Sequence, residues 1–536
     1  MTTMARIAAR RSAAAAAARA TNGAATTPVR RIPQGLASRR VARVSAASGA
    51  EAAATKPTVS DPMRRSGSRA RAPVRDAPTA DRRHCLLANA SQIAARGTPC
   101  SDSFVFPILP RHQANLVATV AYEAVATEVV ATPVAPNGGD SAWMMTSAAL
   151  VLAMNIPGLS MFYGGLVGNK NVLSIFTACM MFTCVMSLMW FGCGYSLAFT
   201  GDNPIIGNFS KAFLKGVSPT SLVDGITEPL WAMFQCTFAV ITPGLIIGAM
   251  AERMKFSAVL VFSIFWSFLV YYPFAHMVWG GGLMEQLGAI DFAGGIVVHL
   301  TAGAAALLAC IMVGPRKAGE QPPHNMPMVL IGTGALWVGW FGFNAGSAVA
   351  ANGIASMAMV TTQIAAATAG LGWALLDWME VGKPTAIGLC CGVVAGLVCV
   401  TPGAGFVSPL GAFCMGAIAA VICRFSCLVV KRTFGYDDAL DVWGVHGVGG
   451  LLGNELTAIF GTTAFGGTEA VASVSKLFLV HTACSLGAIV WSMAVTFVLL
   501  KIIGATIGLR PADEDEILGL DLHDHGEKAY QGLPVY

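Results

Sequence analysis

From Ala142 onward, the sequence repeats runs of mostly apolar residues, each about 20 residues long, which is the length of helix that spans the ~30 Å hydrocarbon core of a bilayer. The whole chain is 55% hydrophobic and only 12% charged, whereas an ordinary globular chain is about 25% charged. These features exclude a soluble enzyme and predict an all-α polytopic membrane protein with eleven transmembrane helices. The expected spans are residues 142–166, 172–198, 229–251, 257–279, 292–314, 326–345, 354–378, 384–402, 408–430, 442–463 and 477–506.

The lysine and arginine residues of the short loops predict the orientation of the helices, because cytosolic loops carry an excess of these residues. Alternate loops, beginning with the first, carry most of these basic residues, whereas the remaining loops carry little beyond Lys211 and Lys215. We therefore expect the first helix to begin outside and the C-terminal arm, residues 507–536, to be cytosolic, or stromal in an organelle. The basic set of loops and the arm contain Lys170, Arg253, Lys255, Arg316, Lys317, Lys383, Lys431, Arg432 and Arg510.

The N-terminal leader, residues 1–110, differs in composition from the transmembrane domain, residues 139–506. The first 111 residues carry 18 Arg and one Lys against five acids, a net charge of +14, and the remainder of the chain carries −9. Residues 1–50 contain nine Arg, many Ala, Ser and Thr and no Asp or Glu, which is typical of an organelle transit peptide. A basic tail that the mature protein keeps is the alternative. Because the basic residues belong to the leader, they do not indicate a nucleic acid partner for the transmembrane domain.

An acid followed eight residues later by a histidine occurs twice in the sequence. Asp291 and His299 lead into the fifth expected span, and Asp438 and His446 lead into the tenth. Because five spans separate the copies, they are expected to have opposite membrane orientations, the inverted-repeat plan of transporters with a site near the midplane. The sequence thus predicts an inverted five-plus-five repeat, with the eleventh helix as an extra brace on the outside of the bundle.

The two repeated histidines are candidates for pore residues, because ionisable groups inside apolar spans are costly and usually functional. His299 and His446 are both flanked by small residues that let helices approach closely. The alternatives are a structural role for each histidine and a two-histidine metal site, but no third ligand with suitable spacing is present. His276, His324 and His481 have no such partner and are expected to be structural.

Aromatic residues near the expected outer helix ends indicate a cation site. Trp279, and Phe343 with Ser347, lie at such ends. An aromatic face and a hydroxyl oxygen together suit a small cation, through cation–π attraction and one hydrogen bond. Phe234 and Phe238 are four residues apart and share one helix face. For Trp279 an interfacial belt is the alternative role, and for the phenylalanine pair it is core packing.

Several ordered motifs between about Gly139 and Tyr530 resemble the family of ammonium transporters, methylammonium permeases and Rhesus proteins. The match to its ammonium transporter branch is carried by Ile156-Pro-Gly-Leu-Ser-Met-Phe-Tyr-Gly-Gly-Leu-Val, Gly248-Ala-Met-Ala-Glu-Arg, Ala275-His-Met-Val-Trp-Gly-Gly-Gly, Asp291-Phe-Ala-Gly-Gly, Gly339-Trp-Phe-Gly-Phe-Asn-Ala-Gly-Ser and Asp441-Val-Trp-Gly-Val-His-Gly-Val.

The resemblance implies an eleven-helix subunit that assembles as a homotrimer with one pore per subunit. It also implies a role for each matching residue. Ammonium would be recruited at an outer site and would then pass an aromatic gate and two hydrogen-bonded histidines. The recruitment residues would be Trp279, Phe238 and Ser347, with Phe234 beside them; the gate would be Phe238 and Phe343; the pore histidines would be His299 and His446; and Asp291 and its symmetry mate Asp438 would order the site.

The resemblance further implies how ammonium and methylammonium are selected. A hydrophobic bore disfavours any bare cation, but ammonium can leave its proton behind and cross as ammonia. The proton would follow a histidine and water route, because imidazole titrates near neutral pH. We expect electrogenic transport. The alternatives are an ammonium sensor that signals through its arm and a Rhesus-like electroneutral ammonia channel, which Trp279 and Ser347 disfavour.

The sequence contains no activated nucleophile, metal cluster or phosphate loop, so we expect neither an enzyme nor a bound cofactor or metal. The expected partners are ammonium as substrate, membrane lipid, further copies of the chain and a cytosolic regulator of the C-terminal arm. The family resemblance favours the plasma membrane, where the protein would serve nitrogen uptake. The leader favours the plastid envelope, or less strongly the mitochondrial inner membrane.

Overall fold

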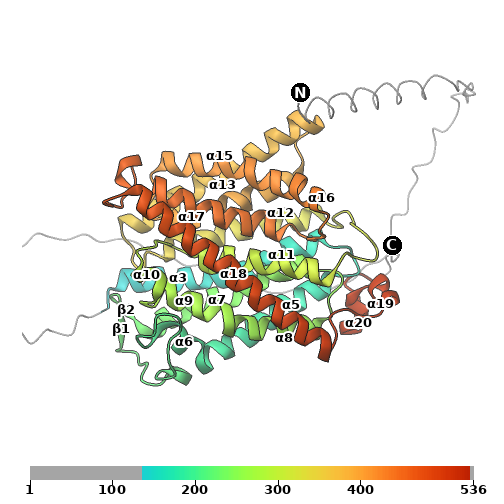
Figure 1. The fold of residues 1–536 in the computed structure, drawn as a ribbon, viewed down its shortest axis with the longest axis horizontal. Coiled ribbons are helices and arrows are strands. Elements are labelled where there is room, and N and C mark those ends of the chain that lie inside the picture. The colour runs from blue at the N-terminus through green and yellow to red at the C-terminus, as the bar shows by residue number, and fades with distance from the viewer. Residues whose placement is uncertain (1–135, 532–536) are drawn as a thin grey trace, which may run out of the picture. The chain divides into compact units, whose positions relative to one another are not determined.

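The computed structural model describes residues 136–531, and nearly all of the regular structure in them is helical (Figure 1). Ten helices of this part of the chain are long and apolar enough to cross a membrane. They cover Gly138–Leu166, Val172–Phe199, Glu228–Met250, Phe256–Gln286, Gly295–Val313, Met326–Ala345, Gly353–Val381, Ala386–Gly403, Pro409–Phe434 and Val474–Thr506. The predicted all-α polytopic membrane fold is therefore confirmed.

The helices of the bundle follow one another with short connections (Figure 1). The α-helices are α3 (Gly138–Ala153), α4 (Ser160–Leu166), α5 (Val172–Met189), α6 (Tyr195–Phe199), α7 (Glu228–Met250), α8 (Phe256–Trp266), α9 (Tyr272–Trp279), α10 (Leu283–Gln286), α11 (Thr301–Val313), α12 (Met326–Trp340), α13 (Gly353–Val381), α14 (Ala386–Val400), α15 (Pro409–Phe425), α16 (Lys431–Phe434), α17 (Val448–Phe460), α18 (Val474–Thr506), α19 (Asp513–Leu518) and α20 (Leu520–His525).

Wider π-helical turns interrupt several of the long helices, and such turns are frequent at functional sites. The π-helical turns are η1 (Met154–Leu159), η2 (Trp190–Gly194), η4 (Ser267–Tyr271), η5 (Gly295–Leu300), η6 (Phe341–Ala345), η8 (Ser426–Val430) and η9 (Trp443–Gly447).

The remaining short elements are 3₁₀ turns and a hairpin. The 3₁₀ turns are η3 (Ala212–Leu214), η7 (Thr401–Gly403) and η10 (Thr463–Phe465). The strands β1 (Leu222–Val223) and β2 (Ile226–Thr227) form an antiparallel hairpin with Leu222 opposite Thr227.

The tenth expected span, residues 442–463, is helical from η9 through α17 but is not one of the ten membrane-length helices found in residues 136–531. It contains the polar residues His446, Asn454 and Glu455, and its glycines let a neighbouring helix approach closely. A Cβ atom added at Gly303 of α11 would lie only 2.2 Å from the Cα atom of Gly447. The count of eleven transmembrane helices stays a prediction.

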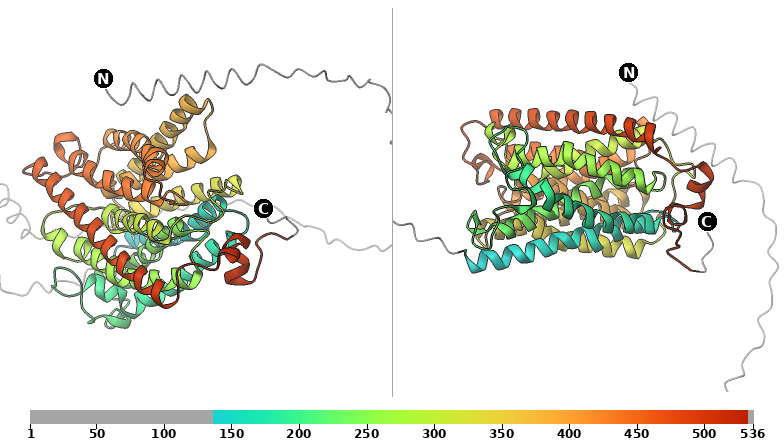
Figure 2. Two further views of the ribbon diagram at one scale, coloured as in Figure 1. Left: turned by 45° about the vertical axis from the view of Figure 1, so that its right-hand side comes forward. Right: turned by 90° about the horizontal axis from the view of Figure 1, so that it is seen from below.

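The two copies of the repeat have the same local structure. In each copy a buried acid precedes a π-helical turn that contains the histidine, and a 13-residue α-helix follows, α11 in one copy and α17 in the other. The last long helix, α18, crosses one outer side of the bundle (Figure 2). This arrangement agrees with the predicted repeat and with the predicted place of the extra helix.

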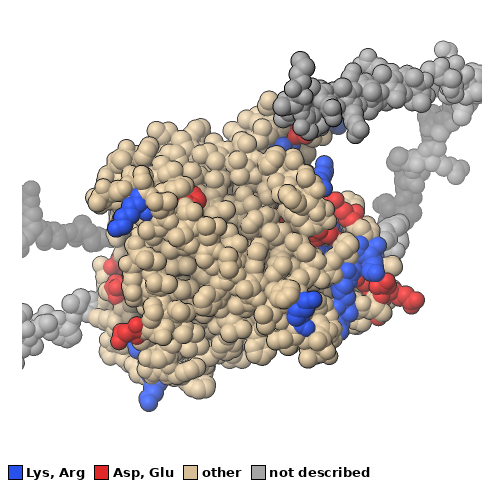
Figure 3. Space-filling model, in the orientation of Figure 1, with Lys and Arg blue, Asp and Glu red and all other residues tan. Residues whose placement is uncertain are grey.

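Charged side chains gather at the two ends of the bundle and leave a broad uncharged band between them (Figure 3). At one end, α19 and α20 pack against loops that the sequence analysis assigned to one side of the membrane. Lys170 Nζ donates to the Ile517 carbonyl over 2.6 Å, and the Lys317 backbone N–H donates to Glu516 over 2.8 Å. These basic loops and the arm therefore lie on the same side, as predicted.

Candidate functional site

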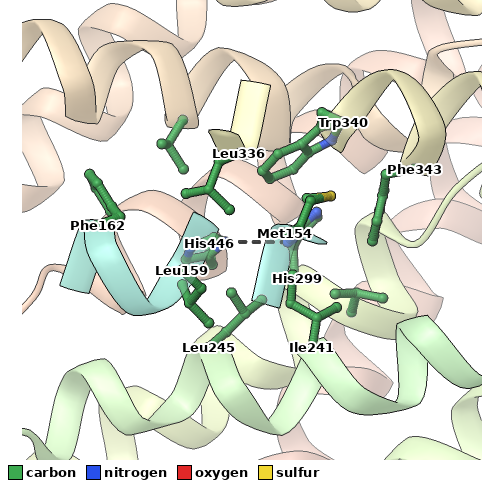
Figure 4. Close-up of a pocket in the computed structure, with 12 residues that line it drawn as sticks. Met154, Leu159, Phe162, Ile241, Leu245, His299, Leu336, Trp340, Phe343 and His446 are labelled. Atoms are coloured by element: carbon green, nitrogen blue, oxygen red, sulfur yellow. Dashed lines mark hydrogen bonds between the residues drawn. The ribbon is translucent and has the colours of Figure 1, made fainter. Parts of the chain in front are cut away.

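The two repeated histidines meet inside the bundle. His299 lies in η5 and His446 in η9, and their side chains are only 2% and 4% exposed. Their Nδ1 atoms are 3.3 Å apart, so one imidazole donates a hydrogen bond to the other (Figure 4). The rings stack with centroids 5.3 Å apart. Two segments that are 147 residues apart in the sequence thus form one polar pair.

A narrow apolar cavity of about 10 Å³ lies against the histidine pair (Figure 4). The Nε2 atom of His299 is buried and has no hydrogen-bond partner among the described residues. A bare cation would lose its hydration here without full compensation, whereas a small neutral molecule could hydrogen-bond to this nitrogen. The cavity is lined by Met154, Leu159, Phe162, Ile241, Leu245, Val298, His299, Leu336, Trp340, Phe343, Val394 and His446.

Two stacked phenylalanines separate this cavity from a second one. The rings of Phe238 in α7 and Phe343 in η6 are 4.2 Å apart at an angle of 22°. Phe343 also lies 5.9 Å from the His299 ring, and Phe238 lies 6.0 Å from the Trp279 ring. Because Phe343 lines the histidine cavity and Phe238 lines the second cavity, the stacked pair lies between them.

The second cavity, which we call the outer pocket, has a volume of about 250 Å³ and brings together the predicted recruitment residues. Trp279 presents its ring, and its Nε1 donates to the Asp291 carbonyl oxygen over 2.9 Å. Ser347 donates its hydroxyl to the Phe343 carbonyl oxygen over 2.8 Å, which leaves its oxygen free to accept. The pocket is lined by Asp224, Trp231, Phe234, Gln235, Phe238, Val278, Trp279, Glu285, Phe292 and Ser347.

Six of these lining residues were not predicted from the sequence: Asp224, Trp231, Gln235, Val278, Glu285 and Phe292. The Gln235 side chain is 5% exposed, and its Oε1 has no partner within residues 136–531. It lies between Phe234 and Phe238, so the helix periodicity could have indicated its proximity. Asp224 and Glu285 belong to a turn and a four-residue helix, where no periodic pattern predicts the direction of a side chain.

Asp291 does not line either cavity but holds the backbone between them. Its carboxylate accepts hydrogen bonds from the backbone N–H groups of Gly294, Gly295, Ile296 and Val297, at 2.8, 2.7, 2.7 and 3.4 Å. It therefore caps η5, which carries His299. Burial raises the pKa of Asp291, and the four N–H groups oppose that rise.

Asp438, in the second copy, has a different environment. Its Oδ2 accepts from the Trp443 backbone N–H over 2.7 Å, while its buried Oδ1 has no hydrogen-bond partner in the described part of the chain. Burial raises the pKa of Asp438, while the positive charges of Lys431 and Arg253 act in the opposite direction. The second acid is thus stabilised by cations as well as by the backbone.

A buried ion-pair cluster lies next to Asp438 in the sequence. Arg316 contacts Glu252 at 2.6 Å and Asp437 at 2.7 Å, and the side chains of Arg316 and Glu252 are almost fully buried. Burial opposes ionisation of Asp437, but hydrogen bonds and charge attraction from Arg316 outweigh it and lower the pKa to about 2. The sequence indicated Arg316 only as a loop charge.

Within residues 136–531, no group of three or more His, Cys, Asp or Glu side chains is arranged to hold a metal ion. The chemistry available at this site is therefore that of aromatic faces, hydroxyl and amide oxygens, and paired imidazoles.

Comparison with known proteins agrees with this geometry. The sequence profile of the Ammonium Transporter Family matches residues 142–530. The ammonium transporter of Aquifex aeolicus is 46% identical over 395 residues, which cover 73% of this chain and 93% of that protein. The structure of Candida albicans Mep2 is similar, with 35% identity, a TM-score of 0.66 and coverage of 73% of this chain and 90% of the other. A structure described as a sensor Amt protein has 28% identity, a TM-score of 0.68 and coverage of 72% and 98%.

These matches confirm the resemblance that the sequence motifs indicated. The profile extends from Ala142 in the first long helix to Tyr530 in the C-terminal arm. The chain belongs to the ammonium transporter family.

Proposed function

We propose that this protein moves ammonium by binding the ion in the outer pocket, removing its proton, and passing ammonia through the cavity that contains His299 and His446. Ammonium transport as such follows from membership of the family, whose members are transport proteins and not enzymes. The observation that carries the proposed mechanism is the pair of hydrogen-bonded imidazoles in an otherwise apolar cavity.

The outer pocket suits a small cation that still carries its charge. Trp279 and Phe238 offer aromatic faces, and the Ser347 oxygen can accept one hydrogen bond from ammonium. Asp224 and Glu285 line the same pocket and add negative charge. A cation is therefore stabilised in the pocket before it meets the phenylalanine gate.

The histidine cavity suits the neutral form of the substrate. Ammonium and potassium have similar size and charge, and both would lose hydration in the apolar cavity. Only ammonium can become neutral by giving up a proton. Ammonia can then donate to an imidazole nitrogen such as His299 Nε2, which is buried without a partner in residues 136–531. Selectivity thus comes from proton loss and not from size.

The released proton would cross by a separate route through the imidazoles and water, which makes transport electrogenic. Imidazole is suited to this role because it exchanges protons near neutral pH. A Rhesus-like electroneutral ammonia channel is the alternative, and the presence of both Trp279 and Ser347 in the outer pocket disfavours it. A sensor is a further alternative, because one of the similar structures is described as a sensor Amt protein.

The protein is an integral multi-pass membrane protein. We further propose that it acts as a homotrimer with one pore per subunit and that its arm faces the cytosol or stroma, where a regulator can reach it. The plasma membrane and the plastid envelope are the proposed locations, and the mitochondrial inner membrane is a weaker candidate. The leader, residues 1–110, and its proposed transit function lie outside the described residues.

The mechanism can be tested with the full-length protein in liposomes. An ammonium jump should evoke an inward current that is absent in His299→Ala, and a potassium jump should evoke none. Internal alkalinisation without current would favour the electroneutral channel. If neither a current nor internal alkalinisation is observed, the result contradicts transport through this pore and favours the sensor.

A further inference from the structure

His481 is a buried histidine that lines neither of the two cavities. It lies on α18, the helix that crosses the outside of the bundle, and its side chain is fully buried. Both of its ring nitrogens have partners. Nε2 accepts from the Ile290 backbone N–H over 3.1 Å, and Nδ1 donates to the Asn454 carbonyl oxygen over 2.7 Å. The ring therefore connects α18 both to α17 and to the loop that precedes η5.

The second contact of His481 is itself firmly held. Asn454 Nδ2 donates to Ser485 Oγ over 2.7 Å, and Ser485 donates to Glu455 over 3.2 Å. Thr482 donates to the other oxygen of Glu455 over 2.9 Å. This polar network fixes the contact of the imidazole with α17. The loop that contains Ile290 is therefore the partner whose position depends more on His481.

That loop carries the residue on which the outer pocket depends. Ile290 directly precedes Asp291, whose carbonyl oxygen accepts from Trp279 Nε1 and whose carboxylate accepts from four backbone N–H groups of η5. Asp291 thus positions the recruitment ring and also the turn that carries His299. Both cavities are therefore connected to His481 through one loop.

We infer that His481 is a positioning residue that holds the Asp291 loop in place, so that Trp279 stays in the outer pocket and η5 stays capped. Its effect on transport rests on the proposed function above, but its effect on the loop does not. Without the imidazole, the partly buried Ile290 N–H would lose its acceptor, while the Asn454 carbonyl group would keep its bond within α17. The last helix then sets the geometry of the substrate site in addition to bracing the bundle.

The test compares two substitutions with a matched control on the same helix. His481→Leu removes both hydrogen bonds, whereas His481→Gln keeps an acceptor oxygen and a donor nitrogen. Trp491→Phe removes a different hydrogen bond of α18, in which Trp491 Nε1 donates to the Leu269 carbonyl oxygen over 2.9 Å. This control tests whether the loss of any hydrogen bond of α18 is sufficient to change the KM for ammonium.

In full-length protein in liposomes, the leucine variant should raise the KM for ammonium about tenfold, the effect expected from losing the hydrogen bond that holds the Asp291 loop, and should change the maximal rate much less. The glutamine variant should restore most of the affinity, and Trp491→Phe should leave the KM unchanged. In a Trp279→Leu background, His481→Leu should add little, because two changes that act through one group are not additive. Equal loss of rate and affinity without rescue by glutamine would overturn the inference.

Hydrogen exchange of the same variants tests the loop without any need for transport. Peptides that cover residues 287–297 should exchange faster in His481→Leu than in the parent protein and should be protected again in His481→Gln. Unchanged exchange in the leucine variant would overturn the inference. If the parent protein carries no ammonium but the loop responds as expected, the proposed function fails and the positioning role stands.

Discussion

Asp291 and Asp438 occupy equivalent places in the two copies of the repeat, yet different groups stabilise them. Asp291 is surrounded by four backbone N–H groups, which satisfy both of its oxygens. Asp438 accepts from the Trp443 N–H, has a second oxygen without a partner in residues 136–531, and is influenced by Lys431 and Arg253. The first acid relies on backbone dipoles, and the second relies partly on cations.

This difference teaches that equal spacing in the sequence does not give equal roles. No lysine or arginine is among the described residues that line the outer pocket, whereas Asp224 and Glu285 are. The negative charge near Asp291 is therefore available to attract a cation. Near Asp438, the buried charges of Arg316 and Arg253 balance the acids. The asymmetry suits a site that recruits ammonium from the outer side.

The largest expected effect comes from the residues that the two copies share. His299→Ala and His446→Ala should each reduce the ammonium-evoked current in liposomes to background, because each removes half of the polar pair in the apolar cavity. Elution at the parent position in size-exclusion chromatography would exclude misfolding. A variant that folds and keeps parent-like selectivity for ammonium over potassium would show that the copies do not share one pore.

Substitution of the two acids tests the proposed difference between the two copies of the repeat. Asp291→Asn should lower the free energy of unfolding by about 2–4 kcal/mol, because an amide nitrogen would face backbone N–H donors. Asp438→Asn should cost less than Asp291→Asn, because only one backbone N–H is hydrogen-bonded to Asp438 and the main loss is its attraction to Lys431 and Arg253. Thermal unfolding of both variants in detergent measures the difference. Equal losses would contradict the proposed difference between the copies.

Acid should weaken the ion-pair cluster beside Asp438. The pKa of Asp437 is lowered to about 2, so its ionised form stabilises the fold above the unfolded pKa, and this contribution disappears as the pH falls from about 4 towards 2. At pH 7, Asp437→Asn should be less stable than the parent by about 2 kcal/mol. This difference in the free energy of unfolding between the parent protein and the variant should disappear as the pH falls, and thermal unfolding at several pH values measures it.

The control for this pH series is Asp513→Asn. Asp513 pairs with Lys317 at 2.9 Å, but both side chains are well exposed, so its removal should change little at any pH. If the stability difference between the parent protein and Asp437→Asn did not depend on pH, the ionised carboxylate would not have the proposed role.

Trp279→Leu tests the outer pocket alone. Loss of the aromatic face should raise the KM for ammonium by about tenfold, which corresponds to a partly desolvated cation–π contact. Assembly should be unaffected, because the ring borders a cavity and its only described hydrogen bond is to the Asp291 carbonyl oxygen. Uptake of labelled methylammonium at several concentrations measures the change. An unchanged KM would exclude Trp279 from recruitment.

The smallest effect is expected at the acids of the pocket rim. Asp224→Asn and Glu285→Gln should each raise the KM by about twofold at low ionic strength and by less at high salt, because exposed charges are screened. A salt titration of uptake checks this. Equal effects at all salt concentrations would indicate a direct contact with the substrate and not an attraction at a distance.

Much of this arrangement could be predicted from the residues. Helix-length apolar runs indicated the membrane fold, and the spacing from Asp291 to His299 and from Asp438 to His446 indicated that the histidines form a pair. The roles of Phe343 and Ser347 depended on the family motifs; in the structure Ser347 lines the outer pocket with Trp279, and Phe343 stacks on Phe238. The site assignments themselves stay predictions until the variants are measured.

Other features depend on contacts that a single sequence does not display. The tenth expected span was assigned by its apolar residues, but it also contains His446, Asn454 and Glu455, and it is not among the ten long apolar helices of the described residues. His481 had no symmetric partner, so its link to Ile290, 191 residues away, could not be inferred from spacing. The π-helical turns that carry His299 and His446 also arise from packing and leave no periodic pattern.

The contact between Gly303 and Gly447 has a consequence for how this protein can change over generations. A side chain at Gly303 would overlap the backbone of the facing helix, so the two helices could not keep their separation. Mutation can vary the residues that line the cavity one at a time, but it has almost no freedom at this crossing. The separation of the two helices thus depends on the absence of a side chain at Gly303, and it is protected from gradual drift.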